Sequence, residues 1–181
     1  MDVHEAIQLR RSIRKYLDKP IPPEVLDRVL DAARRAPSWA NVQTTRWIVV
    51  TDPEIKKQLV TALLPRNPST AAVQNAPVVL GLCYVKGLSG CYQGQPVTSL
   101  GDWGSFDAGL AAANLTLAAK AEGLGTVHVG ALNIENTARI LQVPDDVQFV
   151  ELIPLGYPAD EGRPTPRKEL GELVHREKYR G

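Results

Sequence analysis

The chain has 181 residues, a length that suits one domain, and we expect residues 1–181 to form a single domain without internal repeats. Hydrophobic residues make up 44% and charged residues 23%, which is ordinary for a globular protein with a packed core. The formal net charge of +1 excludes no small ligand, but it gives no reason to expect nucleic acid or an anionic membrane as a partner. No apolar run approaches the roughly 18–20 residues of a membrane span. The acidic start also lacks a signal-peptide pattern, so we expect a cytoplasmic protein.

The first half of the chain alternates helices with buried strands. Asp2 is the expected N-cap of a helix over about 2–11, and Pro23 fits the first turn of the next helix. In that second helix, apolar residues recur at the i, i+3, i+4 and i+7 spacing of one buried face. The expected elements in this half are helices at 2–11, 23–36 and 54–64, and strands at 47–50 and 77–84.

The second half is organised around one long helix. The segment 86–101 contains four Gly and one Pro, and we expect a long loop there. The helix at 103–122 is rich in Ala and Gly, which lets another backbone approach closely, and Gly123 fits its C′ position. The remaining expected elements are strands at 127–129 and 149–155, a helix at 134–141 capped by Asn133, and a short helix at 168–175. Helices with interleaved strands predict an α+β or α/β layered domain.

Cysteine and histidine usage gives no sign of a metal or redox centre. Cys83 and Cys91 are the only cysteines, and their separation is not that of a zinc or dithiol pair. We expect Cys83 to be a buried strand thiol and Cys91 a loop thiol. The three histidines are far apart in the sequence and show no ligand spacing, so no metal site is expected.

A basic cluster follows the first helix. The stretch Arg10-Arg11-Ser12-Ile13-Arg14 contains three guanidinium groups and one hydroxyl. Guanidinium forks match phosphate oxygens two at a time, so this spacing indicates an anion site. The alternative interpretation is a solvated basic turn on the surface.

A polar segment follows the second helix. It contains Pro37, Ser38, Trp39, Asn41 and Gln43. The amides of Asn41 and Gln43 can donate and accept at once, which suits the O2, N3 and O4 edge of a flavin, and Trp39 offers a flat apolar face. The alternative is a helix C-terminal loop whose amides bond to the backbone.

Taken together, these segments resemble the nitroreductase family. Arg-Arg-Ser-Ile-Arg near the start, and Ala-Pro-Ser-x-x-Asn-x-Gln about 25 residues later, are similar to the family's opening signature. Asn75-Ala76-Pro77 before a strand, Asp107 with the Ala-rich helix, Leu155–Pro158 and Pro166–Leu170 follow in the family's order, so that the likeness covers about residues 4–179. Where the family continues Gln-Pro-Trp, this chain has Gln43-Thr44-Thr45, and Trp39 is the candidate replacement for that tryptophan.

The resemblance implies a layered α+β fold with a central, mixed but mainly antiparallel sheet flanked by helices, in an intertwined homodimer. It also implies tightly bound FMN in the cleft between subunits. Arg10, Arg11, Ser12 and Arg167 would hold the phosphate and ribityl chain, and Arg14 would lie near N1 and O2 of the ring. Gly130 and Ala131 would cover one ring face. The residues expected from the partner subunit are Pro37, Ser38, Trp39, Asn41 and Gln43.

The implied activity is an oxidoreductase that passes hydride from NADH or NADPH through FMN to a nitroaromatic, quinone or similar acceptor, by a ping-pong mechanism. Because the flavin performs the hydride chemistry, no catalytic side chain is expected. Two alternatives remain open at this point. One is a reductive dehalogenase- or flavin-destructase-like member of the same superfamily, and the other is a non-catalytic module that binds flavin or phosphate.

Overall fold

The computed structural model describes residues 1–179 of the chain. Its helices are α1 (Val3–Leu9), α2 (Pro23–Arg34), α3 (Pro53–Thr61), α4 (Thr70–Asn75), α5 (Gly104–Ala121), α6 (Ile134–Ile140) and α7 (Leu170–Leu173), with a 3-10 turn η1 at Trp39–Asn41. Its strands are β1 (Thr45–Val50), β2 (Val78–Val85), β3 (Cys91–Tyr92), β4 (Gln95–Pro96), β5 (Gly125–Thr126) and β6 (Val147–Gly156). None of these described helices is both long enough and apolar enough to cross a membrane.

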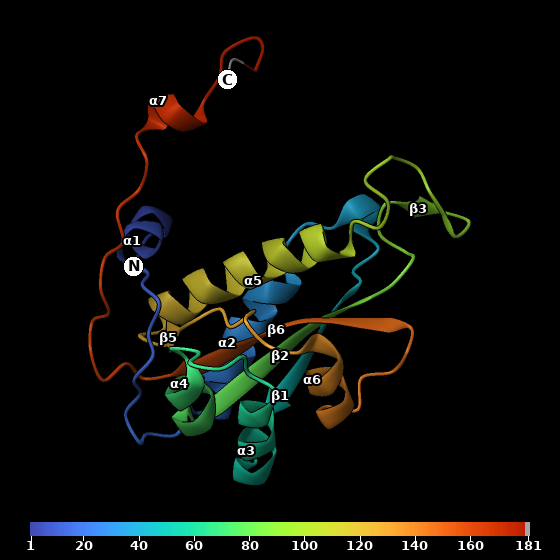
Figure 1. Cartoon of the computed structure of the whole chain (residues 1–181). Coiled ribbons are helices and arrows are strands. Elements are labelled where there is room, and N and C mark those ends of the chain that lie inside the picture. The colour runs from blue at the N-terminus through green and yellow to red at the C-terminus, as the bar shows by residue number, and fades with distance from the viewer. Residues whose placement is uncertain (180–181) are drawn as a thin grey trace.

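A four-stranded sheet forms the middle of the molecule (Figure 1). Its strands lie in the order β1-β2-β6-β5, and each neighbouring pair is antiparallel. Ser12 adds an isolated parallel bridge to Thr126 at the β5 edge. The prediction of an α+β fold with a mixed, mainly antiparallel sheet is therefore confirmed.

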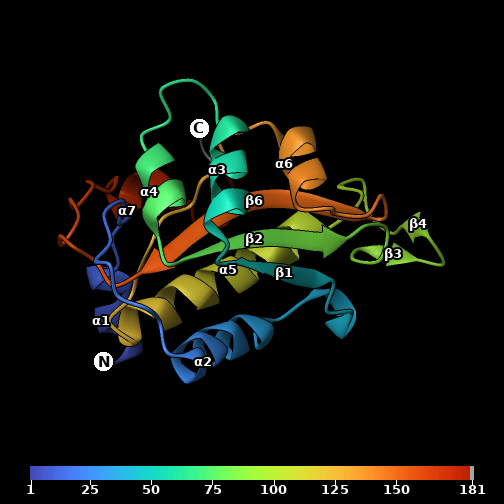
Figure 2. The same ribbon diagram turned by 90° about the horizontal axis from the view of Figure 1, so that it is seen from below.

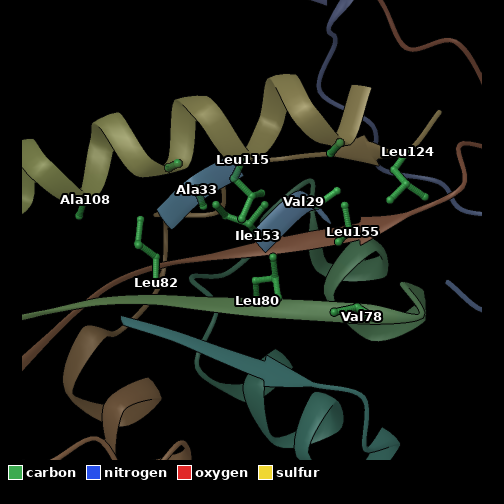
Figure 3. Close-up of a cluster of buried hydrophobic side chains, with 12 residues drawn as sticks. Val29, Ala33, Val78, Leu80, Leu82, Ala108, Leu115, Leu124, Ile153 and Leu155 are labelled. Atoms are coloured by element: carbon green, nitrogen blue, oxygen red, sulfur yellow. The ribbon is translucent and has the colours of Figure 1, made fainter. Parts of the chain in front are cut away.

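Helices cover both faces of this sheet (Figure 2). The central strand β2 alternates its side chains between the faces, as a strand buried on both sides must. Leu80 and Leu82 pack under α2 and α5, whereas Val79 and Cys83 pack toward α3, α4 and α6. Figure 3 shows the first of these two cores, in which Leu115 of α5 and its neighbours lie on the apolar side chains of β2 and β6.

The long helix α5 is apolar on nearly all sides. Its inner face buries Ala108, Ala111, Ala112, Leu115 and Ala119 against α2 and the sheet. Its outer face leaves Phe106 56% exposed and also exposes Gly109 and Ala113. Gly123 ends the helix with φ +75°, as its predicted C′ position requires. A helix that is apolar all round is normally buried on both sides, so the outer face of α5 lacks a partner within this chain.

The structure corrects four details of the predicted elements. The strand expected over 127–129 is wrong in its bounds, because β5 pairs at Gly125–Thr126 and Val129 makes only an isolated bridge to Leu152. Val127 and Val129 are nevertheless buried, so their apolar alternation reflected burial and not ladder pairing. The sequence prediction also lacked α4 and the small β3–β4 hairpin inside the 86–101 loop, and it made the helix at 168–175 longer than the four-residue α7.

Candidate functional site

The two ends of the chain run side by side at the β5 edge of the sheet (Figure 1). Ile13 N–H donates to the Thr126 carbonyl at 2.9 Å, and Ala159 N–H donates to the Lys15 carbonyl at 3.0 Å. Ile13 is buried against Gly125, where an added Cβ would lie only 2.6–2.9 Å from the Ile13 side chain. The absence of a side chain at Gly125 thus lets the N-terminal segment lie on the sheet, next to the segment that follows β6.

A basic cleft of about 780 Å³ opens where these ends meet. We call it the basic cleft, and it is lined by Ile7, Gln8, Arg10, Arg11, Ser12, Arg14, Lys15, Asp160, Gly162, Arg163, Thr165 and Arg167. The predicted phosphate residues Arg10, Arg11, Ser12 and Arg167 therefore come together, with Arg14 beside them. Sequence reasoning missed Arg163, although its position four residues before Arg167 in a polar basic tail was a usable signal.

Positive charge predominates in the lining of the basic cleft, where Asp160 is the one carboxylate beside five arginines and a lysine. None of its arginines forms an ion pair with any residue among 1–179. Arg10 is half-buried, and its pKa is lowered first by burial and then by the charges of Arg167 and Arg11. An excess of like charges without ion pairs favours binding of an anion, and guanidinium forks favour a phosphate.

Several of these arginines are held by bonds to the chain. Nη1 of Arg11 donates to the carbonyls of Gln8 and Arg10, the latter at 2.8 Å. Nη1 of Arg167 donates to the Thr165 hydroxyl at 2.7 Å. Such bonds use part of each fork and fix its orientation, and the remaining N–H groups can serve a ligand.

A hydrogen-bonded chain connects Arg14 with the predicted ring-face segment. Nε of Arg14 donates to the Ser69 hydroxyl at 3.3 Å, and Ser69 N–H donates to Asn67 Oδ1 at 2.9 Å. Asn67 Nδ2 in turn donates to the Ala131 carbonyl at 2.8 Å. Gly130 is exposed, and an added Cβ there would meet no atom within 4 Å. The structure thus links Arg14, through Ser69 and Asn67, to the exposed backbone at 130–131. The sequence analysis did not single out Asn67 and Ser69, because they lie in a loop with two prolines and no apolar periodicity.

The predicted partner-facing residues lie elsewhere. The 37–43 loop, defined as Pro37–Gln43, borders a second cavity of about 430 Å³ near the start of α5, which Pro37, Ser38, Gln43 and Asp107 help to line. Arg10 and Arg11 of the basic cleft also line a neighbouring cavity with Thr116 and Lys120, at the other end of α5. From Asp107 to Lys120 the helix rises about 20 Å at 1.5 Å per residue. One chain alone therefore does not bring the 37–43 loop to the basic cleft.

The backbone of the 37–43 loop is unusual. Ala40, Asn41 and Gln43 have φ of 42°, 57° and 51°, in the left-handed region that non-glycine residues seldom adopt. Gln43 N–H donates to the Ser38 hydroxyl at 3.0 Å, which closes the loop on itself. The Trp39 ring lies 5.1 Å from that of Trp103, centroid to centroid, so it packs on its own chain. Strained backbone that surrounding contacts maintain is typical of functional loops.

The two cysteines of the chain lie in strands β2 and β3. Cys83 is buried, and burial raises the pKa of its thiol to about 11, whereas Cys91 lies half-buried in β3. The prediction of a buried strand thiol is confirmed for Cys83, whereas Cys91, expected in a loop, lies in the short strand β3. Among residues 1–179, no group of three or more His, Cys, Asp or Glu side chains is placed to hold a metal ion.

Comparison with known proteins identifies the family. A model of the nitroreductase family matches residues 7–157. The chain belongs to the nitroreductase family. The matched segment contains the 37–43 loop and the N-terminal part of the basic cleft, and it ends before Arg163 and Arg167.

Individual members of the nitroreductase family resemble the chain over nearly its whole length. A protein of Methanothermobacter thermautotrophicus named as an NADH dehydrogenase/NAD(P)H nitroreductase is 36% identical, covering 99% of this chain and 88% of its own. A Bacillus subtilis FMN reductase [NAD(P)H] is 31% identical, covering 98% and 74%. The crystal structure of nitroreductase A from Vibrio parahaemolyticus superimposes with a TM-score of 0.85 at 28% identity, covering 100% of this chain and 78% of that one.

Proposed function

We propose that this chain, an FMN-dependent NAD(P)H oxidoreductase, passes hydride from NADH or NADPH through its flavin to a nitroaromatic, quinone or similar small acceptor. The observation that carries the proposal is the basic cleft, in which arginines from both ends of the chain gather without an ion-pair partner among residues 1–179. A relative named FMN reductase and others named for NAD(P)H support this assignment of cofactor and donor.

The residues present fit FMN. The basic cleft offers guanidinium forks and the Ser12 hydroxyl to a phosphate. The pKa of Arg10 is lowered first by burial and then by the charges of Arg167 and Arg11, and a phosphate dianion would offset the second of these causes. Arg14 would lie near N1 and O2, where a fixed cation favours hydride uptake. Gly130 and Ala131 would present open backbone to one ring face. When bound, FMN supplies the hydride chemistry, and these side chains bind and orient it.

We also propose that the active form is a homodimer with composite sites. The 37–43 loop lies at the opposite end of α5 from the basic cleft of its own chain, so Asn41 and Gln43 would reach a ring only in the site of a partner. Two further features support a second copy. The outer face of α5 is apolar, and the segment after Glu161 extends from the body with Leu170, Leu173 and Tyr179 exposed (Figure 1).

The open surroundings of the site favour a ping-pong scheme, in which donor and acceptor use the same ring face in turn. The 86–103 segment, which would carry a lid in members that close over their substrate, forms only the small exposed β3–β4 hairpin. Nothing among the described residues favours the dehalogenase or flavin-destructase alternative over this scheme.

The test is an anaerobic titration of the purified protein with NADH and with NADPH, while the flavin spectrum is recorded. Bleaching of the flavin, followed by recovery on addition of a quinone or nitroaromatic, is expected. Double-reciprocal plots at several acceptor concentrations should run parallel. Protein that purifies without flavin and does not bind added FMN contradicts the proposal, and intersecting plots contradict the ping-pong scheme alone.

A further inference from the structure

Asp107 of α5 is a buried carboxylate that the proposed chemistry does not use. Its residue is only 2% exposed. Both carboxylate oxygens accept from the Trp39 N–H at 3.2 Å, and Oδ2 also accepts from the Ser89 hydroxyl at 2.6 Å. No ion pair to Asp107 is found in the described part of the chain. Burying a carboxylate that has only neutral hydrogen-bond donors costs desolvation free energy, which suggests that Asp107 has a positioning role.

What Asp107 holds is the first residue of the strained part of the 37–43 loop. Three of the next four residues have left-handed φ, a conformation that is unfavourable for any residue other than glycine. The bonds inside the loop, from Gln43 N–H to Ser38 Oγ and from Val42 N–H to the Trp39 carbonyl, join only its own members. The bond to Asp107 is the one that attaches the loop backbone at Trp39 to the rigid long helix.

We propose that Asp107 is a positioning residue for the flavin ring bound in the partner subunit's cleft. By fixing the Trp39 N–H to α5, it sets where Asn41 and Gln43 present their amides to the ring edge. This inference rests on the proposed composite FMN site and adds a residue that acts across the dimer without touching the cofactor.

The same carboxylate joins the 86–103 segment to the loop. Ser89 is fully buried, and its carbonyl accepts from Trp103 N–H at 3.0 Å. Trp103 in turn packs on Trp39 and also on Phe106, at 5.1 Å and 5.3 Å between ring centroids. Gly90 fits tightly under this ring, because an added Cβ would lie 2.3 Å from Trp103. The hairpin segment and the 37–43 loop are therefore anchored at one point, on Asp107.

A purely structural role is the competing explanation. An acidic side chain in the first turn of α5 also stabilises the helix through its dipole. Asp102 provides a matched control, because its carboxylate accepts from Gly104 N–H and Gly87 N–H at the same helix end, both at 2.7 Å, without bonding to the 37–43 loop. A substitution at Asp102 changes charge and capping at that end and leaves the Trp39 contact intact.

The first measurement is the affinity for FMN and for riboflavin of Asp107→Ala, Asp107→Asn and Asp102→Ala. Loss of the carboxylate leaves the Trp39 N–H unpaired, so Asp107→Ala should weaken both affinities by a similar factor, on the order of 10- to 100-fold. Asp107→Asn keeps an acceptor oxygen and should recover most of the loss. Asp102→Ala should lower thermal stability without weakening flavin affinity. Equal loss in the Asp102→Ala and Asp107→Ala variants would show a structural role only.

The deciding experiment is a mixed dimer of one Asp107→Ala protomer and one Arg10→Ala protomer, purified with two different affinity tags. If Asp107 acts on the partner's site, one site carries both defects and the other carries neither. The mixed dimer should then bind one FMN per dimer with wild-type affinity. If Asp107→Ala is too unstable to purify, Asp107→Leu takes its place, because it also removes both acceptor oxygens but fills the buried space.

If Asp107 acts only within its own chain, each site of the mixed dimer carries one defect, and no site of wild-type affinity appears. That outcome overturns this inference while the wild-type protein still binds FMN. Wild-type protein that binds no FMN would overturn the proposed function instead, so that the two failures are distinguishable.

Discussion

The basic cleft and the 37–43 loop, at the two ends of α5, are built in different ways. The basic cleft depends on ordinary backbone pairing of the segments after α1 and after β6, and its lining is dominated by arginines that form no ion pair among residues 1–179. The loop has little charge but an unusual backbone, with three left-handed residues anchored by a distant buried carboxylate. On the proposed assignment, the phosphate site would depend on side-chain composition, whereas the ring-edge site would depend on backbone placement by packing.

The largest expected effect is a difference between FMN and riboflavin affinity that distinguishes variants of the basic cleft from variants of the 37–43 loop. Arg10→Ala should weaken FMN binding on the order of 10- to 100-fold, because a charge-assisted bond to the phosphate is lost. The affinity for riboflavin, which lacks the phosphate, should change little. Asn41→Ala should instead weaken both ligands by the same factor, since its amide is proposed to face the ring. Fluorescence titration of apoprotein with each ligand measures these ratios.

Arg139→Ala serves as the control for Arg10→Ala. Arg139 is an exposed cation on α6 whose Nη1 donates to Asn136 Oδ1 at 3.3 Å, and α6 lies on the opposite face of the sheet from α5. Its removal should leave both affinities unchanged. Equal losses for FMN and riboflavin in Arg10→Ala would show that the basic cleft does not hold the phosphate.

A second comparison perturbs the packing of each region by replacing a glycine with alanine. In Gly125→Ala the new Cβ would lie 2.6 Å from Ile13 Cγ1 and 2.7 Å from Ile13 Cβ, so the N-terminal segment must shift. Overpacking of this kind costs about 1–3 kcal/mol. The preference for FMN over riboflavin should fall, because the arginines move with Ile13. Thermal unfolding and the two ligand affinities test this expectation.

Gly104→Ala is the matched change at the other end of α5, where the new Cβ would lie 2.1 Å from the Tyr84 ring. It should cost similar stability, but it should keep the preference for FMN over riboflavin while weakening both. If Gly104→Ala loses that preference and Gly125→Ala keeps it, the assignment of the two regions is reversed.

The sequence predicted the basic cleft better than the loop. Arg10, Arg11, Ser12 and Arg167 converge as expected, because the segment after α1 bridges to Thr126 at the β5 edge and to Pro158 in the segment that follows β6. Whether they bind FMN stays a prediction. The location of the main helices and of β1, β2 and β6 also followed from apolar periodicity and from Pro and Gly positions.

What the sequence could not show depends on contacts between residues far apart in the chain. The bond from Trp39 N–H to Asp107 spans 68 positions, and the left-handed φ of Ala40 has no signal in an alanine. Asn67 and Ser69 acquire significance only when the loop before α4 lies on Ala131. The helix α4 itself is too short for a periodic pattern, so tertiary packing decides it.

A smaller effect tests whether the loop backbone is strained. Ala40 has φ 42° and is exposed, so a substitution there changes conformational preference with little change in packing. Ala40→Val should destabilise the fold by about 1–2 kcal/mol, because a β-branched residue resists the left-handed region. Ala40→Gly should be within about 0.5 kcal/mol of the wild type, since relief of strain is offset by unfolded-state entropy. Denaturant unfolding measures both, and equal destabilisation by Val and Gly would contradict a strained loop.

The smallest expected effect is in the salt dependence of binding. Raising NaCl from about 50 mM to about 500 mM shortens the Debye length several-fold and should weaken FMN binding by a few-fold, because exposed Arg163 and Arg167 would attract the phosphate through solvent. Riboflavin binding, which depends on the loop and the ring face, should be nearly insensitive to salt. Arg167→Ala should flatten the FMN dependence, whereas Asn41→Ala should lower affinity and leave the slope unchanged. Equal salt dependence of FMN and riboflavin affinity would mean that the charges of the basic cleft do not bind the FMN phosphate. The basic cleft and the 37–43 loop would then differ only in backbone geometry.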